Sequence, residues 1–527
     1  MFAPTLELAK RLLDEEVIDQ VAYDRMKAGL IDQLCEDGRV AGGELGSTFV
    51  RSDVEDGCIC CMKVYDVRFP TSDGGHGSDA IHKDPDYSCV YVELETKGAT
   101  PLEGFGLTFS LGRGNEVTKL CVEAFADSVL GTHAQREIFE DMAGFTRKLC
   151  NDGQLRWLGP DKGVVAMACG AILNAAWDMW ARSVGKPLWL MVSDLTPEQV
   201  MATVDFQYLE DAAIELDAEF YADGAAAPEY TDFQEVSLEI LRAAQDGDVR
   251  EGRIAEMKTV GFPCYTTSLG WLGYTDEYIK DVSVEYLSNG YTRFKMKVGA
   301  DIEDDIRRAK YIRSLIGGPE KCVLAMDANQ RWGVDQCVGY MKRLAFASPL
   351  WIEEPTSPDD VLAHRRIRDG LAREIPECKI GVASGEVMQN KVLWKQLFQQ
   401  KGVDFAQIDS CRMAGVGEII AVMLMAKSHG VPIVPHAGGV GLCEYVRHLA
   451  MIDYVCVNGN PLSENVQRMS ESTTHLHEFF EDTEDFIVNG HYRAPSAPGY
   501  ARMTRAAIEE YAYPNGSLWL KRLSGAK

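Results

Sequence analysis

The chain has 527 residues, with 53 Lys or Arg against 80 Asp or Glu, so its formal net charge is −27. A surface of this charge repels the phosphate backbone of nucleic acids and anionic lipid headgroups, which excludes general binding to either. An anionic small-molecule substrate would therefore need a local site of positive charge. No stretch reaches the roughly 18 consecutive apolar residues of a membrane span, so none is expected.

The first thirty residues carry acidic side chains that targeting sequences lack: Glu7, Asp14, Glu15, Glu16, Asp19 and Asp24. Secretory signal peptides have an apolar centre, and mitochondrial presequences are poor in acids. The 15 cysteines are odd in number and mostly lie in apolar segments, which indicates free thiols in a reducing compartment. We therefore expect a cytoplasmic protein.

The first half of the chain is predicted to be an extension followed by a mixed α+β domain. Residues 1–57 combine an amphipathic helical pattern with a stretch rich in glycine and acids, and we set them apart as an N-terminal extension. Residues 62–110 alternate with period two between turn residues, which predicts a small antiparallel sheet. Helical patterns follow, among them residues 164–184. The acidic stretch 205–252 is interpreted as an insertion or mobile loop.

From about residue 256 onward, short apolar runs alternate with helical patterns. The runs begin about 27 residues apart on average, which is the length of one strand–loop–helix–loop unit. They begin near Pro263, Tyr291, Cys322, Pro349, Ile380, Phe405, Val431 and Tyr454. Eight such units predict a (β/α)₈ barrel. An open doubly wound sheet is the alternative, and the lack of a glycine-rich phosphate-binding motif argues against it.

The second expected strand carries two lysines on one face. Lys295 and Lys297 alternate with the apolar side chains of Phe294, Met296 and Val298. Because the apolar face must meet the helices, both lysines are predicted to point into the barrel. Burying two ammonium groups side by side is costly unless anions or a metal site surround them. An edge strand with a solvated lysine face is the alternative.

The next three expected strands end in acids, namely Asp327, Glu353 and Glu386. The carboxyl ends of barrel strands converge on the mouth, where the function of such barrels is carried. Three oxygen ligands without Cys or His suit a hard divalent cation, Mg²⁺ first. A pair of glycosidase carboxylates is a competing interpretation, but it leaves the lysines without a role.

The sixth and seventh expected strands end near Asp409 and His436. A carboxylate beside an imidazole fixes its tautomer and raises its basicity, so this pair is a candidate catalytic dyad, although a lone histidine is often structural. A lysine and a histidine on two sides of a metal could each reach the carbon-2 proton of a chelated carboxylate. Lys297 would act as a base in its neutral form, and we expect Lys295 and the cation to lower its pKa.

Several long motifs connect the chain to a known family. They are residues 66–71 (DVRFPT), 77–80 (GSDA), 84–87 (DPDY), 177–180 (WDMW), 265–274 (YTTSLGWLGY), 327–332 (DANQRW), 351–360 (WIEEPTSPDD) and 435–444 (PHAGGVGLCE). Through them, residues 66–513 resemble the enolase superfamily in its mandelate-racemase-like branch, and within it the L-fuconate dehydratases. The acidic stretch and the first 57 residues lie outside this resemblance.

The resemblance implies the domain organisation and the roles of the site residues. An α+β capping domain, formed by residues 58–255 and by the returning C-terminal segment 485–527, would close over a (β/α)₈ barrel formed by residues 256–484. Asp327, Glu353 and Glu386 would bind Mg²⁺, and Lys297 and the His436–Asp409 dyad would be the acid/base pair. The implied substrate contacts are Lys295, Gly77, Ser78, Asp79, Tyr87 and Glu471.

The implied reaction is the dehydration of a six-carbon sugar acid, of the L-fuconate or L-galactonate class, to a 2-keto-3-deoxy acid. Lys297 would remove the carbon-2 proton, and protonated His436 would assist loss of the carbon-3 hydroxyl. A racemase or epimerase acting at carbon 2 and a non-catalytic relative are the alternatives. The expected partners are an acid-sugar substrate and further copies of the chain, without nucleic acid or membrane.

Overall fold

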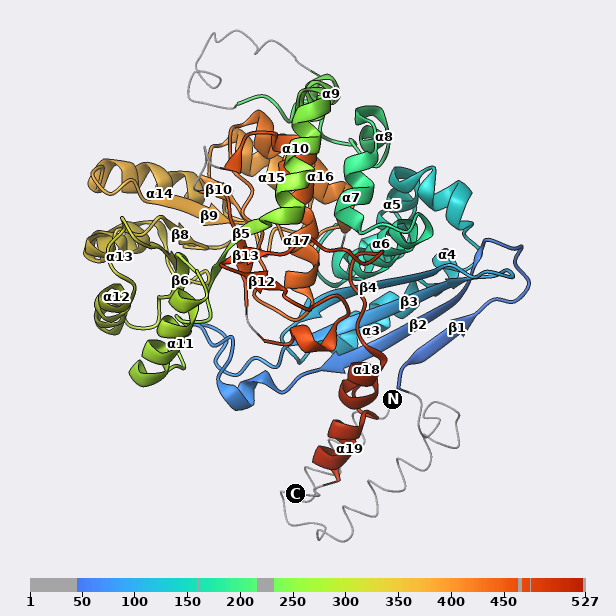
Figure 1. Cartoon of the computed structure of the whole chain (residues 1–527), viewed down its shortest axis with the longest axis horizontal. Coiled ribbons are helices and arrows are strands. Elements are labelled where there is room, and N and C mark those ends of the chain that lie inside the picture. The colour runs from blue at the N-terminus through green and yellow to red at the C-terminus, as the bar shows by residue number, and fades with distance from the viewer. Residues whose placement is uncertain (1–44, 160, 216–231, 463–466, 474, 525–527) are drawn as a thin grey trace.

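The computed structural model describes residues 45–159, 161–215, 232–462, 467–473 and 475–524. These residues are organised by two sheets (Figure 1). One sheet has four strands in the order β1-β2-β3-β4. The other has the order β10-β9-β8-β7-β6-β5-β13-β12, with β11 also paired to β5. The molecule is therefore a mixed α/β protein, as the sequence predicts.

The first sheet is antiparallel and comes from the early part of the chain. Its strands are β1 (Ser47–Val50), β2 (Ile59–Arg68), β3 (Ser88–Thr96) and β4 (Glu103–Ser110). This confirms the antiparallel sheet expected from the period-two pattern of residues 62–110. β1 pairs with β2 and lies within residues 1–57, so the sheet begins inside the range set apart as an extension. Residues 1–44 lie outside the described part.

The helices α3 (Asn115–Ala124) and α6 (Gly163–Ser183) pack against this sheet, and α6 is the longer of the two. The helices α4 (Ala126–Val129), α5 (Met142–Cys150), α7 (Leu188–Asp194) and α8 (Pro197–Ala202) belong to the same part of the chain. In β4, Gly104 and Gly106 lie directly against the backbone of α6 at Ala175 and Ala171. By length and composition α6 could cross a membrane, but 89% of its apolar window is buried inside the structure. It is therefore a core helix.

The second sheet is built mainly from parallel strands. They are β5 (Phe262–Thr266), β6 (Arg293–Lys297), β7 (Val323–Asp327), β8 (Trp351–Glu353), β9 (Gly381–Ser384), β10 (Phe405–Ala406) and β11 (Ser470–Ser472). The strands β5 to β10 pair with one another in parallel, and β11 also pairs in parallel with β5. Beyond β10, Ala406 forms a parallel bridge with Ile433. The Glu471 N–H then donates to the Pro435 carbonyl at 2.9 Å.

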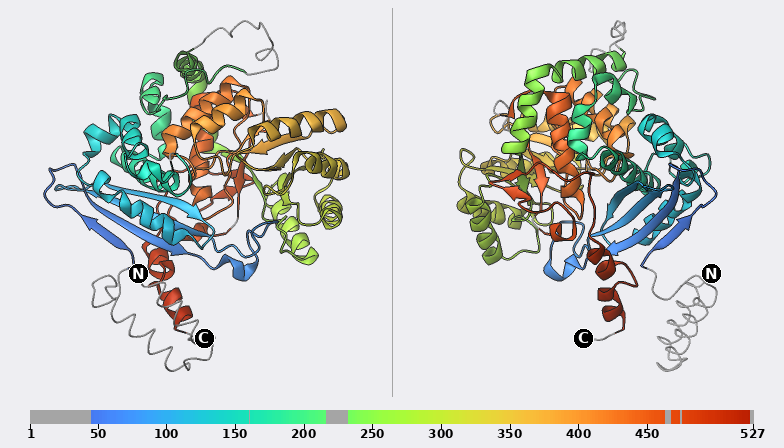
Figure 2. Two further views of the ribbon diagram at one scale, coloured as in Figure 1. Left: turned by 180° about the vertical axis from the view of Figure 1, so that it is seen from behind. Right: turned by 45° about the vertical axis from the view of Figure 1, so that its right-hand side comes forward.

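Helices between the parallel strands lie on the outside of this sheet (Figures 1 and 2). They are α11 (Asp276–Ser288), α12 (Ile302–Ile316), α13 (Val334–Leu344), α14 (Val361–Glu374), α15 (Lys391–Gln399), α16 (Gly415–Ser428) and α17 (Leu442–Ile452). Side chains from β5, β7, β8, β9 and β10 and from two adjoining segments form a separate apolar cluster, which contains Tyr265, Ala325, Trp351, Ala383, Phe405, Val434 and Met469. The interior of the sheet is therefore filled below the strand ends that carry the polar residues.

The prediction of a last parallel strand near Tyr454 is wrong. The run near Tyr454 continues α17 as a π-helical turn, Asp453–Asn458, and the parallel neighbour of β5 is β11, which follows later in the chain. Tyr454, Val455, Cys456 and Val457 are all buried. A short apolar run of this kind fits a buried helical turn as well as a buried strand, so its pattern could not distinguish the two.

The interpretation of residues 205–252 as a loop is wrong for its second half. Residues 233–244 form α9 (Phe233–Ala244), and α10 (Gly247–Thr259) follows after two residues. Asp232 caps α9 by accepting a hydrogen bond from the Gln234 N–H, and the buried side chains of Phe233 and Leu241 belong to the core. Residues 216–231 lie outside the described part.

The C-terminal segment joins the two sheets. The hairpin β12 (Ile487–Val488) and β13 (His491–Tyr492) pairs with β5, and the chain then runs to α18 (Arg505–Tyr511) and α19 (Ser517–Leu523). After α18, Ala512 bridges Val67 of β2, and the Tyr513 N–H donates to the Asp66 carbonyl at 2.7 Å. The end of the chain thus packs against the first sheet.

Candidate active site

β6 brings both predicted lysines into a cluster of carboxylates. Lys295 and Lys297 are buried, as the alternation along this strand predicts. Lys295 Nζ lies 2.5 Å from Glu353 Oε1 and 2.9 Å from Glu471 Oε1. Lys297 Nζ lies 2.5 Å from Asp327 Oδ2. The buried ammonium groups are therefore surrounded by anions, which is the condition that makes their burial tolerable.

The pKa of Lys297 is raised, although Lys295 lowers it as expected. Burial lowers this pKa most and Lys295 also lowers it, but the carboxylates of Asp327, Glu386 and Asp79 together outweigh both, so the net shift is upward. The pKa of Lys295 is raised in the same way, because Glu353 and Glu471 outweigh burial. The direction of the Lys295 effect on the pKa of Lys297 is thus confirmed, and the lowering of this pKa by a bound cation stays a prediction.

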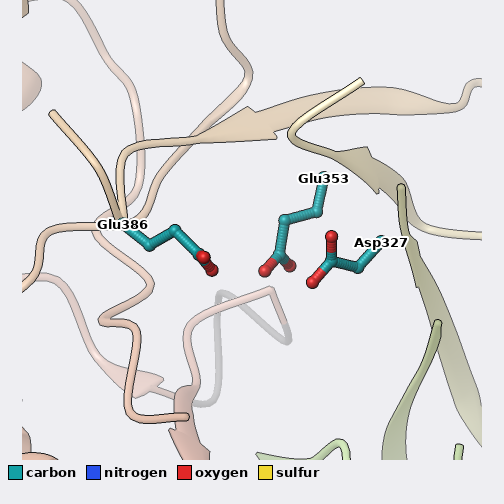
Figure 3. A group of neighbouring side chains, drawn as sticks. All are labelled: Asp327, Glu353 and Glu386. Atoms are coloured by element: carbon teal, nitrogen blue, oxygen red, sulfur yellow. The ribbon is translucent and has the colours of Figure 1, made fainter. Parts of the chain in front are cut away.

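Asp327, Glu353 and Glu386 meet at one end of the parallel strands (Figure 3). Asp327 ends β7, Glu353 ends β8, and Glu386 follows β9 by two residues. Each of the three offers a carboxylate oxygen, and these oxygens lie within 4.8 Å of one another. Burial raises the pKa of Glu353 to about 8, with the neighbouring carboxylates adding to this and Lys295 opposing it. The three acids thus repel one another in their charged forms, and a cation bound between them would remove this repulsion.

The donor set fits a divalent metal ion. Glu386 Oε2 is buried and makes no hydrogen bond to any residue that the structure describes, although His436 Nε2 lies 3.4 Å away. A buried carboxylate oxygen without a hydrogen-bond donor is an available ligand. Three carboxylates without Cys or His match a hard cation that prefers oxygen ligands, and Mg²⁺ commonly keeps waters or substrate oxygens at its remaining positions.

His436 and Asp409 form the dyad that their strand-end positions predict. His436 Nδ1 lies 2.8 Å from Asp409 Oδ2, and both side chains are buried. Burial lowers the pKa of His436, but Glu386 and the hydrogen bond to Asp409 outweigh it and raise the pKa to about 9. The imidazole therefore favours its protonated form at neutral pH, which suits a proton donor.

Glu471 lies on β11, at the position that the resemblance assigns to a strand-eight acid. Its Oε2 accepts a hydrogen bond from the Ala437 N–H at 3.1 Å, and its Oε1 accepts one from the Thr267 hydroxyl. Burial would raise the pKa of Glu471, but Lys295 and His436 outweigh it and hold it well below the usual value. Glu471 is therefore an anion that links the lysine side of the site to the histidine side.

Three of the four predicted capping-loop residues line the same cavity as the catalytic candidates. The cavity has a volume of about 400 Å³, and Gly77, Asp79 and Tyr87 line it together with Lys297 and His436. The Ser78 hydroxyl instead donates to the Gly75 carbonyl and accepts from the Gly273 N–H, each at 2.9 Å. Ser78 therefore ties the capping loop to the loop after β5 and is absent from the cavity lining.

Asp79 is paired with a histidine that no motif in the sequence indicated. Asp79 Oδ2 lies 2.9 Å from His82 Nδ1, and Asp79 Oδ1 accepts from the N–H groups of Ile81 and His82. His82 lines the cavity as well. Its spacing of three residues from Asp79 is visible in the sequence, but the turn that brings the side chains together is not.

Other residues of the cavity also lie outside the sequence-based predictions. Thr267, Trp271, Asn329, Gln330 and Arg412 line it. Asn329 and Gln330 have positive φ angles of 44° and 65°, a conformation that turns the chain sharply after Asp327. They follow the predicted ligand Asp327 by two and three residues, and this position is the indication that the sequence offers. Arg412 lies on an irregular loop, whose side-chain direction no periodic pattern predicts.

Comparison with known proteins identifies the relatives of this chain. The family description that matches residues 279–502 is "Enolase C-terminal domain-like". The human protein named mitochondrial enolase superfamily member 1 is 46% identical over 468 residues, which are 89% of this chain and 98% of that protein. Its crystal structure is similar with a TM-score of 0.81 at 45% identity, covering 89% of this chain and 99% of that chain.

Two dehydratases are also similar to this chain. The L-galactonate dehydratase of Hypocrea jecorina is 43% identical over 451 residues, 85% of this chain and 92% of that protein. The L-talarate/galactarate dehydratase of Salmonella typhimurium LT2, crystallised with Mg and L-lyxarohydroxamate, has a TM-score of 0.60 at 21% identity, covering 85% and 90% of the two chains. The second likeness concerns the fold alone. The near full-length match to the human protein confirms the resemblance found in the motifs: this chain belongs to the enolase superfamily.

Proposed function

We propose that the protein is a Mg²⁺-dependent hydro-lyase that dehydrates a six-carbon sugar acid to a 2-keto-3-deoxy acid. The observation that carries this proposal is one cavity lined by both Lys297 and the His436–Asp409 dyad, beside the carboxylate triad. The name of the similar L-galactonate dehydratase of Hypocrea jecorina supports this class of reaction.

The fold proposed for this site is a closed (β/α)₈ barrel formed by residues 256–484, capped by residues 58–255 and 485–527. Parallel pairing from β11 through β5 to β10, with the bridge to Ile433, supports eight positions around the barrel. The hydrogen bond from the Glu471 N–H to the Pro435 carbonyl supports closure between the last two positions. The apolar cluster inside the strands is typical of a packed barrel interior.

Asp327, Glu353 and Glu386 would hold the Mg²⁺ ion. When bound there, the ion supplies positive charge opposite a substrate carboxylate whose negative charge increases as the carbon-2 proton leaves. Lys295 would contact the same carboxylate, and Glu471 would hold Lys295 in place through its 2.9 Å ion pair. The positively charged groups required by an anionic substrate in an acidic protein are thus provided locally.

Lys297 and His436 divide the proton transfers. Lys297 in its neutral form accepts the carbon-2 proton, which requires that Asp327 be engaged elsewhere and no longer hold the ammonium form. His436, protonated and oriented by Asp409, donates its proton to the carbon-3 hydroxyl, so that the carbon–oxygen bond breaks and water leaves. The resulting enol takes up one proton at carbon 3, loses the proton of its carbon-2 hydroxyl, and becomes the keto acid.

The capping loop would enclose the sugar acid. Gly77, Asp79 and Tyr87 line the cavity and would contact the substrate directly. Ser78 would act indirectly, by fixing the capping loop to the loop after β5 through its hydrogen bond with the Gly273 N–H. A side chain at position 77 would collide with the Tyr87 ring, so glycine is required there for the loop to close.

L-Galactonate and L-fuconate are the proposed substrates, and they differ only at carbon 6, which is a hydroxymethyl group in the first and a methyl group in the second. The similarity to the L-galactonate dehydratase of Hypocrea jecorina supports the first. A homo-oligomeric assembly and a cytoplasmic location stay predictions.

A panel of hexonates and pentonates tests the proposed function. The purified protein is incubated with each acid and Mg²⁺, with and without excess EDTA, and keto-acid product is quantified by NMR. We expect product from L-galactonate or L-fuconate that disappears with EDTA. Epimerised acid without keto product would indicate a racemase or epimerase instead. No turnover across the panel would favour a non-catalytic relative.

A further inference from the structure

Arg412 is a cation of the cavity for which the proposed chemistry has no use. It lines the cavity together with Lys297 and His436. Within the part of the chain that the structure describes, no carboxylate forms an ion pair with its guanidinium. The contact of this group is between Nη1 and the Met167 sulfur at 3.7 Å. A thioether is a weak acceptor, so the N–H groups of Arg412 are available to another acceptor.

The backbone at Arg412 is fixed by the carboxylate that orients the catalytic histidine. Asp409 Oδ1 accepts hydrogen bonds from the N–H groups of Cys411 at 2.7 Å and of Arg412 at 2.9 Å. Asp409 Oδ2 binds His436 at 2.8 Å. The loop that presents Arg412 is therefore held at a defined position relative to the groups that act on carbons 2 and 3.

The side chain of Arg412 extends from this loop toward the capping residues. Its partner Met167 lies in α6, and Met167 lines the cavity together with Ser110 and Leu111 at the end of β4. Carbons 1 to 3 of a substrate must lie at the triad, Lys297 and His436. We place carbons 4 to 6 away from these groups, along the wall to which Arg412 and Met167 contribute.

We propose that Arg412 binds the oxygen on carbon 6 of the sugar acid and makes L-galactonate the preferred substrate over L-fuconate. This inference rests on the proposed function and names the substrate of the same site. A guanidinium donates to a hydroxyl oxygen, whereas a methyl group at the same place leaves its N–H groups without an acceptor. A hydrogen bond from a charged group contributes about 1.5–3 kcal/mol, which corresponds to roughly tenfold to hundredfold in kcat/KM.

The test compares kcat/KM for L-galactonate and L-fuconate in the wild type, R412M and R412K with saturating Mg²⁺. We expect the wild type to favour L-galactonate by about tenfold or more. R412M should bring the ratio near one by losing activity on L-galactonate alone. R412K should be intermediate, because an ammonium group keeps the charge but not the planar donor arrangement. The matched control is R366M, since Arg366 is an exposed arginine on the outer helix α14.

Two results would overturn the role of Arg412. They are an equal loss on both acids in R412M, and a ratio that stays at the wild-type value. The thermal unfolding temperature of each variant shows whether it is folded. If the wild type makes no keto acid from either substrate, the proposed function fails. Calorimetric binding of the two acids to the wild type and R412M then still tests Arg412, because the ratio of their Kd values must change in the same direction.

Discussion

Each charged side chain of the cavity lies close to a group of opposite charge. Among the described residues, Arg412 is the exception. Lys295 lies between Glu353 and Glu471, Lys297 lies against Asp327, and His436 lies against Asp409. These pairs explain why the pKa values of the lysines are raised although the groups are buried. The same pairs mean that the proposed metal binding and proton transfer would use overlapping carboxylates.

Glu386→Gln tests the metal site at the scale of a single residue. A ligand that binds only the folded state stabilises it, by about 2.7 kcal/mol at a hundred times its Kd. We expect saturating Mg²⁺ to raise the thermal unfolding temperature of the wild type and to have a much smaller effect on Glu386→Gln. Differential scanning calorimetry measures both.

Glu374→Gln is the control for the metal-site test, because Glu374 is an exposed acid on α14 and lies outside the triad. Its Mg²⁺-induced shift should match that of the wild type. Equal shifts in the wild type and Glu386→Gln would be evidence against the triad as the metal site.

The residues at strand ends could be predicted from the sequence, and those on irregular loops could not. Asp327, Glu353 and Lys297 follow from alternation along strands and from the convergence of strand ends. His82 and Arg412 depend on loop conformations, for which no periodic pattern exists. The direction of the Lys297 pKa shift also required the Asp327 distance, which only the structure supplies.

Among the elements, α6 and β4 make a backbone-to-backbone contact that depends on glycine. A Cβ atom at Gly106 would collide with the Ala171 carbonyl and with the backbone of Ala175. Most residues of α6 are buried in the core. A shift of α6 or β4 away from the added atom would therefore disturb the surrounding packing. The small residues of β4 and α6 therefore bring the two elements together.

Gly106→Ala should lower the free energy of unfolding by about 1–3 kcal/mol, since a core without free volume does not accept an added methyl group easily. Gly252→Ala is the matched control. Gly252 is exposed within α10, and a Cβ atom added there would meet no other atom within 4 Å. Gly252→Ala should raise the free energy of unfolding by about 0.5–1 kcal/mol. Urea denaturation measures both, and a neutral Gly106→Ala would refute the proposed close contact.

Helices and strands could be predicted from the sequence where the hydrophobic pattern and the length of the segment indicated the same element. The antiparallel strands and α6 follow from period-two alternation and from a long helical stripe. The Tyr454 run and residues 233–252 departed from expectation for different reasons. The first is too short to separate strand from buried helix, and the second has a composition typical of loops although Phe233 and Leu241 anchor it as a helix.

Over the whole molecule, the capping loop and the parallel sheet meet at a seam that contains two histidines. We define the seam by His76, Trp271, Tyr274 and His475. His76 Nδ1 lies 2.8 Å from the Tyr274 hydroxyl, and the rings of His76 and His475 stack with centroids 5.1 Å apart. Burial and the neighbouring His76 and His477 lower the pKa of His475 to about 3. The neutral imidazole is thus the form that fits the folded seam.

Acid should weaken this seam. Because the folded pKa of His475 lies below its unfolded value, its contribution to stability is present above pH 6.5 and is lost as the pH falls toward 3. Each pH unit in this window corresponds to about 1.4 kcal/mol. The free energy of unfolding of His475→Gln should therefore fall less than that of the wild type between pH 7 and pH 5, as measured by urea denaturation.

His491→Gln is the control for this prediction, because His491 lies in β13, away from the seam. Its pH dependence should follow the wild type. If His475→Gln and the wild type lose the same stability over this interval, His475 does not make the seam sensitive to acid.

The arrangement of the two sheets was only partly accessible from the sequence. The spacing of apolar runs predicted successive parallel strands, and six of the eight expected runs became β5 to β10. The pairing of β11 with β5, and the return of Ala512 to Val67, join residues far apart in the chain, and no local pattern contains such contacts. The resemblance supplied the return of the C-terminal segment, which local reasoning did not.

The division of labour between Lys297 and His436 is the central claim, and isotope exchange tests it most directly. The wild type, Lys297→Ala and His436→Gln are incubated with L-galactonate and Mg²⁺ in D₂O, and NMR follows deuterium at carbon 2 and the keto acid. We predict that Lys297→Ala shows neither exchange nor product. His436→Gln should still exchange the carbon-2 proton while dehydration falls by roughly 10²-fold or more. Exchange at the wild-type rate in Lys297→Ala would contradict the account.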